Sequence, residues 1–370
     1  MLKTYRNIPV LPIQEVLGTP QGRSEHKLGP IYPDWTGANK VRFHRNGRPH
    51  DTRPDLKVNE NLTYLKGTYA WGGPIVDHFG HQIADFSTRL AMYKGMNCHY
   101  LFSVGKLNGF NIKNLPKFVV QILEWFHVPL DKIIFVDKPV LVDKLIVAPQ
   151  QEQLSQIAPN NKYLNILGEL SKVNGLNHSG SAPLVYVTRS GQSKGILAGE
   201  KYLESIFRDE GYKIVRPENL PLKEQLDIYI NAEQLIFSEG SAMYGIQLLG
   251  KLNCDVHVLQ RRPNRTIGKA GIGSRTKSLN YHPIGKLVAG LNKKGRPLAD
   301  AGITIITILE VKKLLNFLNI DSSKVDEVSL HEAIMLDVKK FMDDEKLHHR
   351  ASVEGHISTI EKQLEKLGLI

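Results

Sequence analysis

Short apolar segments alternate with longer amphipathic ones between residues 184 and 259, and few folds accommodate this pattern. Each apolar segment has the length of a strand, and the segments between them have the length and periodicity of helices. Strands joined by helices run parallel in one sheet, with the helices packed on its faces. We therefore expect a Rossmann-like sheet that binds ligands at the carboxyl ends of its strands. The predicted strands are Leu184–Thr188, Tyr212–Arg216, Gln234–Phe237 and Val256–Leu259, and the predicted helices are Gly199–Asp209, Leu222–Asn231 and Ser241–Leu249.

The first half of the chain shows a less regular α/β alternation from Thr68 onward. Residues 1–65 are rich in Pro, Gly and Arg without clear periodicity, which predicts loops and short strands. The polar, turn-rich segment 174–183 is typical of a linker. We predict an N-terminal α/β domain (1–178), a C-terminal Rossmann-like domain (179–320) and a charged helical tail (321–370) that packs across the domains or mediates self-association. Further predicted elements are strands at 98–104, 132–136 and 140–147 and helices at 116–127 and 162–173.

Composition narrows the class of protein. The chain has 41% hydrophobic and 23% charged residues, as globular proteins do. We expect a soluble, intracellular protein, because no apolar run reaches the ~18 residues of a membrane span and the first residues lack the apolar core of a signal peptide. Cys98 and Cys254 lack metal-site or disulfide spacing, so we interpret both as reduced core residues.

The chain carries 48 Lys and Arg against 37 Asp and Glu, a net charge of +11. This excess favours phosphate-bearing small molecules, nucleic acid or anionic membranes as partners, or simply aids solubility. Nucleic acid is disfavoured, since there is no zinc-finger spacing and no aromatic-rich RNA-binding strand.

The run Trp71–Leu90 contains the most chemically suggestive pattern. At about 100° per residue, four polar side chains fall within an arc of about 80° on a predicted helix, and four apolar side chains cluster elsewhere. Such a helix docks by its apolar face and presents its polar face to a ligand, although a solvated surface helix is the alternative. The polar residues are His78, His81, Asp85 and Arg89, and the apolar ones are Phe79, Ile83, Phe86 and Leu90.

Two predicted strand ends of the second domain suit a phosphorylated ligand. Arg189, with Lys194 shortly after it, supplies cations for a diphosphate. At Glu239–Ala242 a strand ends at Gly240 and a helix begins with Ser241, whose free N–H groups bind anions or are capped by its own hydroxyl. Glu239 is a candidate acceptor for ribose hydroxyls. Segment 268–275 is either a lid over a phosphate or an ordinary flexible loop, and no GxGxxG follows a strand and no GxxxxGK[ST] occurs.

These motifs resemble bacterial members of glycosyltransferase family 61, over about residues 68–260. The resemblance lies in the GGP and HFGH motifs with an acidic residue and an arginine, within Trp71–Arg89, and in a donor-side pattern. It implies a GT-B-like enzyme, with two Rossmann-like domains facing a cleft, that transfers a sugar with inversion from a nucleotide-sugar donor. The donor-side pattern consists of Val187–Ser190, Gly211–Val215, Glu224–Gln225, Ala232–Ile236 and Glu239–Ala242.

The resemblance also implies roles for the candidate residues. Asp85, or His81 held by it, is the expected base. His78, Arg89 and Asp77 are expected to position substrate. The expected donor-binding residues are Arg189, Lys194, Glu239, Gly240, Ser241 and Ala242.

The implied setting is surface-polysaccharide assembly at the cytoplasmic face of the membrane. A glycan or lipid-linked acceptor, peripheral contact with anionic lipid and self-association through the C-terminal helices belong to this expectation, and neither a metal nor another cofactor is required. Two alternatives remain open. One is a metal-dependent hydrolase using Asp77, His78, His81 and Asp85. The other is a non-catalytic glycan or nucleotide binder.

Overall fold

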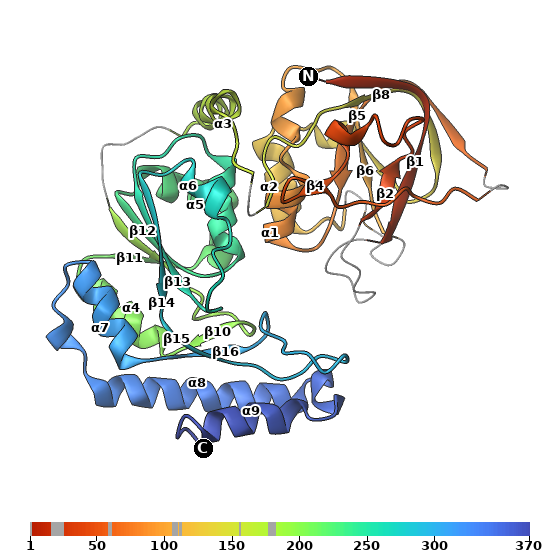
Figure 1. Ribbon diagram of the computed structural model, residues 1–370. Coiled ribbons are helices and arrows are strands. Elements are labelled where there is room, and N and C mark those ends of the chain that lie inside the picture. The colour runs from red at the N-terminus through yellow and green to blue at the C-terminus, as the bar shows by residue number, and fades with distance from the viewer. Residues whose placement is uncertain are drawn as a thin grey trace.

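The protein is represented by a computed structural model that describes residues 2–15, 26–57, 61–105, 110, 113–154, 157–176 and 183–370. Its described strands form a six-stranded, a five-stranded and a three-stranded sheet and a small hairpin. We call the described residues from 2 to 176 the first lobe and those from 183 to 370 the second lobe (Figure 1). The fold is mixed α/β, as predicted. The boundary predicted at 178/179 lies outside the described residues.

The first lobe is built on a six-stranded sheet of order β2-β1-β8-β5-β6-β7. Strand β1 pairs antiparallel with β2 and β8, and the other pairs are parallel. The expectation of loops and short strands in residues 1–65 is wrong for β1, which runs from Lys3 to Glu15 and buries Ile8 and Val10. Its prolines and charged residues obscure the alternation. The other strands are β2 (Lys27–Pro30), β5 (Thr63–Pro74), β6 (His99–Ser103), β7 (Ile133–Val136) and β8 (Val140–Val147).

Helices and a hairpin complete the first lobe. The hairpin pairs β3 (His44–Arg45) with β4 (Arg48–Pro49). Helix α3 starts at an Asn160 cap, whose side chain accepts a hydrogen bond from the Tyr163 amide at 3.0 Å. The helical segments are the 3₁₀ turns η1 (Asn39–Val41), η3 (Leu90–Tyr93) and η4 (Leu130–Lys132), helices α1 (Phe79–His81), α2 (Lys117–Trp125) and α3 (Asn161–Val173), and the π-helical turn η2 (Gln82–Phe86).

The second lobe contains a parallel sheet in the order β11-β9-β12-β13-β14. Four of these strands are predicted from the sequence, and β14 is not. The connecting helices of this sheet follow the prediction closely, except that the segment after β12 is a 3₁₀ helix, η6. The elements are β9 (Leu184–Val187), α4 (Glu200–Asp209), β11 (Lys213–Val215), η5 (Pro217–Asn219), α5 (Leu222–Asn231), β12 (Gln234–Ser238), η6 (Ser241–Leu248), β13 (Asp255–Gln260), α6 (Lys269–Gly273) and β14 (Ser278–Pro283).

One hydrophobic core joins the two lobes. Alternating residues of a strand face opposite sides of its sheet. Phe102 of β6 and Phe237 of β12 lie in the same cluster of buried residues, whereas Leu101 and Ile236 face other clusters. The indole of Trp125 also donates a hydrogen bond to the carbonyl of Leu248, at 3.3 Å. The lobes are therefore packed against each other through apolar side chains.

The C-terminal helices belong to the second lobe. They cover a three-stranded sheet of order β10-β16-β15, and Leu330 and Ile360 share a core with β10 residue Leu197 (Figure 1). Asp326 caps α8 by accepting hydrogen bonds from two backbone amides. The elements are β10 (Ile196–Ala198), β15 (Gly285–Val288), β16 (Ile303–Ile306), α7 (Ile308–Phe317), η7 (Ser322–Lys324), α8 (Glu327–Leu347), η8 (His349–Ser352) and α9 (His356–Glu365).

The structure also bears on the predictions for the two cysteines and for membrane-spanning helices. Cys98 and Cys254 are free and buried, as predicted. Among the helices that the structure describes, none is both long and apolar enough to cross a membrane.

Candidate functional site

The segment after β5 departs from the predicted single helix. Strand β5 extends to Pro74, and the segment then forms α1, the π-helical turn η2 and the 3₁₀ turn η3. The Ser87 amide donates to the Gln82 carbonyl, five residues back, which shifts the side chains after it out of α-helical register. The four predicted polar side chains therefore do not form one exposed row: His78 is exposed and His81 is half-buried, whereas Asp85 and Arg89 are buried. Asp77, just before them, is exposed.

His81 and Asp85 form a hydrogen-bonded pair, one turn apart. Nδ1 of His81 lies 2.7 Å from Oδ2 of Asp85. The guanidinium of Arg45, from the β3–β4 hairpin, binds both Asp85 oxygens, with its Nε 3.1 Å from Oδ1. A third contact fixes the backbone, since Gln150 donates to the Asp85 carbonyl at 3.1 Å. Asp85 is thus held on several sides.

This geometry assigns different properties to the two members of the pair. Burial acts to raise the pKa of Asp85, but the hydrogen bonds from His81 and Arg45 outweigh it and lower that pKa. Nδ1 of His81 lies 3.0 Å from Arg45 Nη2 as well as 2.7 Å from Asp85 Oδ2. Because an ionised carboxylate only accepts hydrogen bonds, we assign the proton of the imidazole to Nδ1, directed at Asp85. Nε2 then holds the lone pair, and it has no hydrogen-bond partner among the described residues. The pair can therefore take a proton at His81, with Asp85 orienting the ring.

Helix α1 touches the second lobe directly. A Cβ atom added to Gly80 would lie 3.0 Å from Cβ of Ser241 and 3.0 Å from Cδ2 of Tyr244. His78 caps α1 through Nδ1, and its ring stacks at 4.4 Å from that of His81. The histidines thus flank the point at which the first lobe meets the Gly240–Ser241 turn.

The carboxyl ends of three adjacent strands supply the opposite side of the site. The parallel register pairs Val187 with Phe237 and Ser238 with Leu259, so β9, β12 and β13 end at one edge. The chain leaves these strands at Arg189, at Glu239–Gly240 and at Arg261–Arg262. A Cβ on Gly240 would overlap the Arg189 guanidinium, so only glycine permits this packing.

Glu239 and Lys194 do not have the surroundings expected for their predicted roles. Both carboxylate oxygens of the fully buried Glu239 are bound by Arg262, one through its backbone amide at 3.1 Å and one through its guanidinium. The ammonium of Lys194 is exposed, and the Lys194 carbonyl accepts from Arg189 Nη2 at 2.9 Å. Glu239 is therefore oriented toward Arg262 and not toward an open ribose site.

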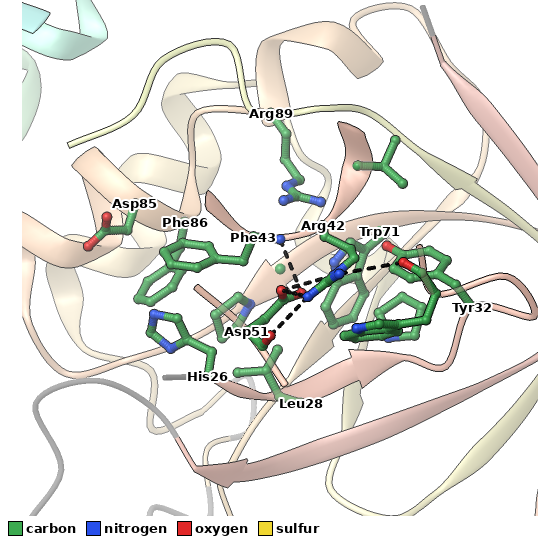
Figure 2. Close-up of a pocket in the computed structure, with 15 residues that line it drawn as sticks. His26, Leu28, Tyr32, Arg42, Phe43, Asp51, Trp71, Asp85, Phe86 and Arg89 are labelled. Carbon is green, nitrogen blue, oxygen red and sulfur yellow. Dashed lines mark hydrogen bonds and ion pairs between the residues drawn. The ribbon is translucent and has the colours of Figure 1, made fainter. Parts of the chain in front are cut away.

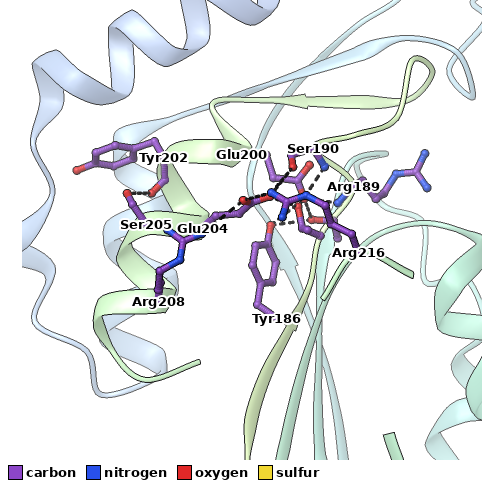
Figure 3. A network of polar contacts seen from close by, with 11 residues as sticks. Tyr186, Arg189, Ser190, Glu200, Tyr202, Glu204, Ser205, Arg208 and Arg216 are labelled. Carbon is purple, nitrogen blue, oxygen red and sulfur yellow. Dashed lines mark hydrogen bonds and ion pairs between the residues drawn. The ribbon is translucent and has the colours of Figure 1, made fainter. Parts of the chain in front are cut away.

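Two buried carboxylates of α4 support the Arg189 turn (Figure 3). Glu200 accepts from the Arg189 amide at 2.9 Å and from the Tyr186 hydroxyl at 2.8 Å. Glu204, one helical turn later, accepts from the Thr188 hydroxyl at 2.7 Å. Burial raises the pKa of Glu200. These bonds hold the turn in one conformation.

A pocket of about 400 Å³ lies between the lobes. Phe79 and Phe118 of the first lobe line it, facing Arg189 and Ser241 of the second. Pro217–Pro221 forms one wall of this pocket, although no functional role is predicted for this segment from the sequence. The pocket is large enough for part of a nucleotide, and its other lining residues include Lys117, Gln121, Thr188, Gln192, Gln225 and Ala242.

Arg89 points into a different pocket, inside the first lobe (Figure 2). This pocket is small, about 40 Å³, and is lined by aromatic residues such as Trp71 and Phe86 and by the Arg42–Asp51 ion pair. Arg89 is 4% exposed, and its Nη1 has no hydrogen-bond partner. The structure thus separates Arg89 from the pocket that contains Arg189.

Segment 268–275 does not behave as a phosphate lid in this structure. Arg275 is completely buried and binds both carboxylate oxygens of Glu152, at 2.6 and 2.9 Å. Glu152 belongs to the first lobe, so this ion pair fastens the lobes together. The residues around it, including Gly271 and Ile272, are buried as well.

The donor set for a metal ion is poor. In the part of the chain that the structure describes, no three His, Cys, Asp or Glu side chains lie close enough to hold one. Of the four residues considered for a hydrolase, Asp85 has both oxygens bonded to Arg45, and His78 Nδ1 accepts from the His81 amide. The geometry gives that alternative no support.

Sequence reasoning missed Arg45, Glu152, Arg261 and Arg262. Arg45 and Glu152 contact residues that are distant in the sequence, and the residues around them give no indication of these contacts. No role is predicted for Arg261 and Arg262 from the sequence, although they follow the predicted strand at Val256–Leu259. The carboxyl-end rule that selected Arg189 would also have selected them.

Comparison with known proteins identifies one family. The model described as Glycosyltransferase 61 matches residues 79–251, from the start of α1 to just beyond η6. The matched range includes His81, Asp85, Arg189 and Gly240 and excludes Arg45 and Arg261. A search of curated proteins found no match.

Proposed function

We propose that this chain, which matches the model of glycosyltransferase family 61 over residues 79–251, transfers a sugar from a nucleotide-sugar donor to an acceptor hydroxyl with inversion at the sugar. This match supports glycosyltransferase activity. The nature of the donor, the acceptor and the stereochemistry are our proposal.

The observation that carries the proposal is the juxtaposition of two unlike groups. His81, oriented by Asp85, lies next to Gly80, and Gly80 packs against Ser241 at the Gly240 turn. A base on one side and an anion-binding turn on the other are the two requirements of metal-independent sugar transfer.

The proposed step balances as a single displacement. The acceptor oxygen attacks the anomeric carbon as His81 Nε2 takes its proton, and the bond from that carbon to the diphosphate oxygen breaks. The electron pair leaves with the diphosphate, whose added charge Arg189 and the amides at Ser241 stabilise. Asp85 stabilises the imidazolium that forms. Attack opposite the leaving group inverts the anomeric centre.

The remaining roles follow from the same arrangement. Ala242, which lines the interlobe pocket, contacts the donor. The exposed residues Asp77 and His78, just before α1, position substrate. Arg89 acts on the acceptor side. We retain a GT-B-like arrangement as the finer proposal for the fold, with the shared core limiting how far the lobes open.

We also propose a cellular setting. The acceptor is a glycan or lipid-linked sugar of a surface polysaccharide, and the net charge of +11 assists contact with an anionic membrane at its cytoplasmic face. Self-association through the C-terminal helices remains part of this proposal.

A donor screen tests the function directly. A ligand that binds the native state stabilises it by about 2.7 kcal/mol at a hundredfold excess over Kd, and this stabilisation raises the melting temperature. We expect one family of nucleotide sugars, and the matching nucleoside diphosphate, to stabilise the protein more than nucleoside monophosphates do. The absence of stabilisation by any nucleotide sugar would contradict the proposal.

No metal is required in the proposed step, which predicts turnover in a chelator. After dialysis against EDTA, the enzyme should retain its donor-consuming activity in full. Complete loss of turnover with recovery on adding manganese would contradict this mechanism and would favour a metal-dependent one.

The non-catalytic alternative makes a different prediction for Asp85→Asn. A transferase loses polysaccharide product and keeps donor binding, because Asp85 lies behind His81 and outside the interlobe pocket. A pure binding protein leaves cellular polysaccharide unchanged on the same substitution.

A further inference from the structure

Three arginines surround the Gly240 turn, but only one of them is neutralised. Arg262 pairs with Glu239 and with Asp300. Arg189 and Arg261 form no ion pair within the described ranges, and their guanidinium groups donate to backbone carbonyls, of Lys194 at 2.9 Å and of Glu239 at 3.1 Å. The turn therefore holds two guanidinium groups with no carboxylate at ion-pair distance among the described residues. Burial lowers the pKa of Arg189, although the charges of Glu200 and Glu239 act to raise it.

The energetic cost of burying a guanidinium group without an ion-pair partner is clearest for Arg261. Arg261 is 4% exposed, and among the described residues neither its Nη1 nor the Nε of Arg189 has a hydrogen-bond partner. Burial, and secondarily the Arg189 cation, lower the pKa of Arg261 to about 10. Buried guanidinium groups are ordinarily paired, as Arg275 is with Glu152. An unpaired one indicates a missing anion.

Both guanidinium groups converge on one backbone segment. Arg261 Nε donates to the Glu239 carbonyl, and Arg189 packs against the next residue, Gly240. The eight-residue helix η6 begins immediately afterward, at Ser241, where backbone N–H groups are free to bind an anion. On the other side, a Cβ at Gly195 would lie 2.7 Å from Cζ of Arg261, so that glycine makes room for the guanidinium.

We propose that Arg189 and Arg261 together bind a phosphoanhydride at the Gly240 turn, and that Arg261 provides the second cation there in place of Lys194. The identification of this anion with the donor's diphosphate rests on the proposed function. The match to the family does not imply the role, because Arg261 lies beyond residues 79–251.

Lys194 is the matched control. Lys194 lies in the loop that follows Arg189 and carries the same charge as Arg261. Its ammonium is exposed, however, and only its backbone carbonyl contacts the arginines. Replacing its side chain leaves that carbonyl in place. The two cations can therefore be distinguished by single substitutions that each remove one charge.

The experiment is calorimetric titration with sodium pyrophosphate and, separately, orthophosphate, in EDTA at constant ionic strength. We expect pyrophosphate to bind about tenfold or more tightly than orthophosphate, because it reaches both cations. Arg261→Gln should weaken pyrophosphate binding by about tenfold or more, as loss of a charge-assisted hydrogen bond does. Lys194→Gln should change it by less than about threefold.

Several results would overturn the inference. They are no binding of pyrophosphate to the wild type, unchanged binding by Arg261→Gln, and an equal loss in Lys194→Gln. The unliganded melting temperature of Arg261→Gln should equal or exceed that of the wild type, since an unpaired buried charge has been removed. If this variant does not fold, Arg261→Lys serves instead, because it keeps the positive charge but lacks the forked guanidinium. Arg261→Lys should bind pyrophosphate more weakly than the wild type does. Wild-type affinity for pyrophosphate in this variant would contradict the proposal.

The inference and the proposed function can fail separately. If pyrophosphate binding depends on Arg261 but the protein transfers no sugar from any donor, only the proposed function is contradicted. If the protein transfers sugar and Arg261→Gln leaves the donor Kd unchanged, only the proposed role of Arg261 is contradicted.

Discussion

Arg45 determines which member of the His81–Asp85 pair can act as a base. A carboxylate that a guanidinium holds through both oxygens is a poor proton acceptor, and Asp85 is also completely shielded from solvent. The structure therefore leaves Nε2 of His81 as the available lone pair, and Asp85 becomes an orienting group. This choice between the two residues was open from the sequence alone.

The Arg45–Asp85 ion pair predicts a pH-dependent loss of stability. Because the folded pKa of Asp85 is below its ordinary value, its stabilisation is complete above pH about 4 and declines as the pH falls through the folded pKa. Arg45→Met should cost about 3 kcal/mol at pH 7, and the difference from the wild type should shrink near pH 3. Urea unfolding across this range measures it.

Arg48 provides the control in the same hairpin, since its side chain is exposed. Arg48→Met should change the free energy of unfolding by less than about 0.5 kcal/mol at any pH. An equal effect of both substitutions, or a constant effect of Arg45→Met from pH 7 to pH 3, would contradict the role given to the ion pair.

At the scale of elements, α1 and η6 form the joint on which the site depends. Gly80→Val should force these elements apart, because its Cβ would crowd Ser241 and Tyr244. We expect donor turnover to fall by about tenfold or more, since small misplacements of catalytic groups are costly. Steady-state kinetics with the identified donor measures the loss.

A glycine in α3 separates this effect from general disturbance. A Cβ at Gly168 meets nothing within 4 Å, so Gly168→Ala should raise stability by about 0.5–1 kcal/mol with unchanged turnover. Full activity of Gly80→Val would show that the contact between α1 and η6 does not position the site.

Local pattern predicted the elements of the second lobe well and those of the site less well. Short apolar strands such as β12 and amphipathic helices such as α5 can be recognised from the pattern of about ten consecutive residues. The π-helical turn η2 could not be predicted, because the periodicity of this segment fits an ordinary α-helix and gives no sign of the wider turn. Strand β1 was missed since its pairing with β8 is fixed by residues more than a hundred positions away.

At the scale of the whole molecule, the buried Glu152–Arg275 ion pair ties the lobes together. Glu152→Gln would leave a fully buried guanidinium without its partner and should cost about 3–5 kcal/mol, measured by chemical unfolding. The surface pair of Lys172 and Glu169 is the control, and Glu169→Gln should leave the free energy of unfolding nearly unchanged, because solvent screens this exposed pair. A cost for Glu152→Gln no larger than this would contradict the tie.

The sequence could not reveal this tie, or the shared core around it, because both depend on contacts between the lobes. The alternation of elements predicted two α/β units, and the described strands form a six-stranded sheet in the first lobe and a five-stranded sheet in the second. How the units meet is decided by residues such as Trp125 and Arg275, which look ordinary within their own segments.

The central claim is that His81, oriented by Asp85, deprotonates the acceptor in an inverting sugar transfer. The most direct test follows the anomeric proton by NMR while the enzyme consumes the donor identified by the screen, in wild type and in His81→Gln. The account predicts a product of inverted configuration and, in His81→Gln, a rate lower by about 10²–10⁴ with donor Kd unchanged. Retained configuration, or wild-type turnover by His81→Gln, would contradict it.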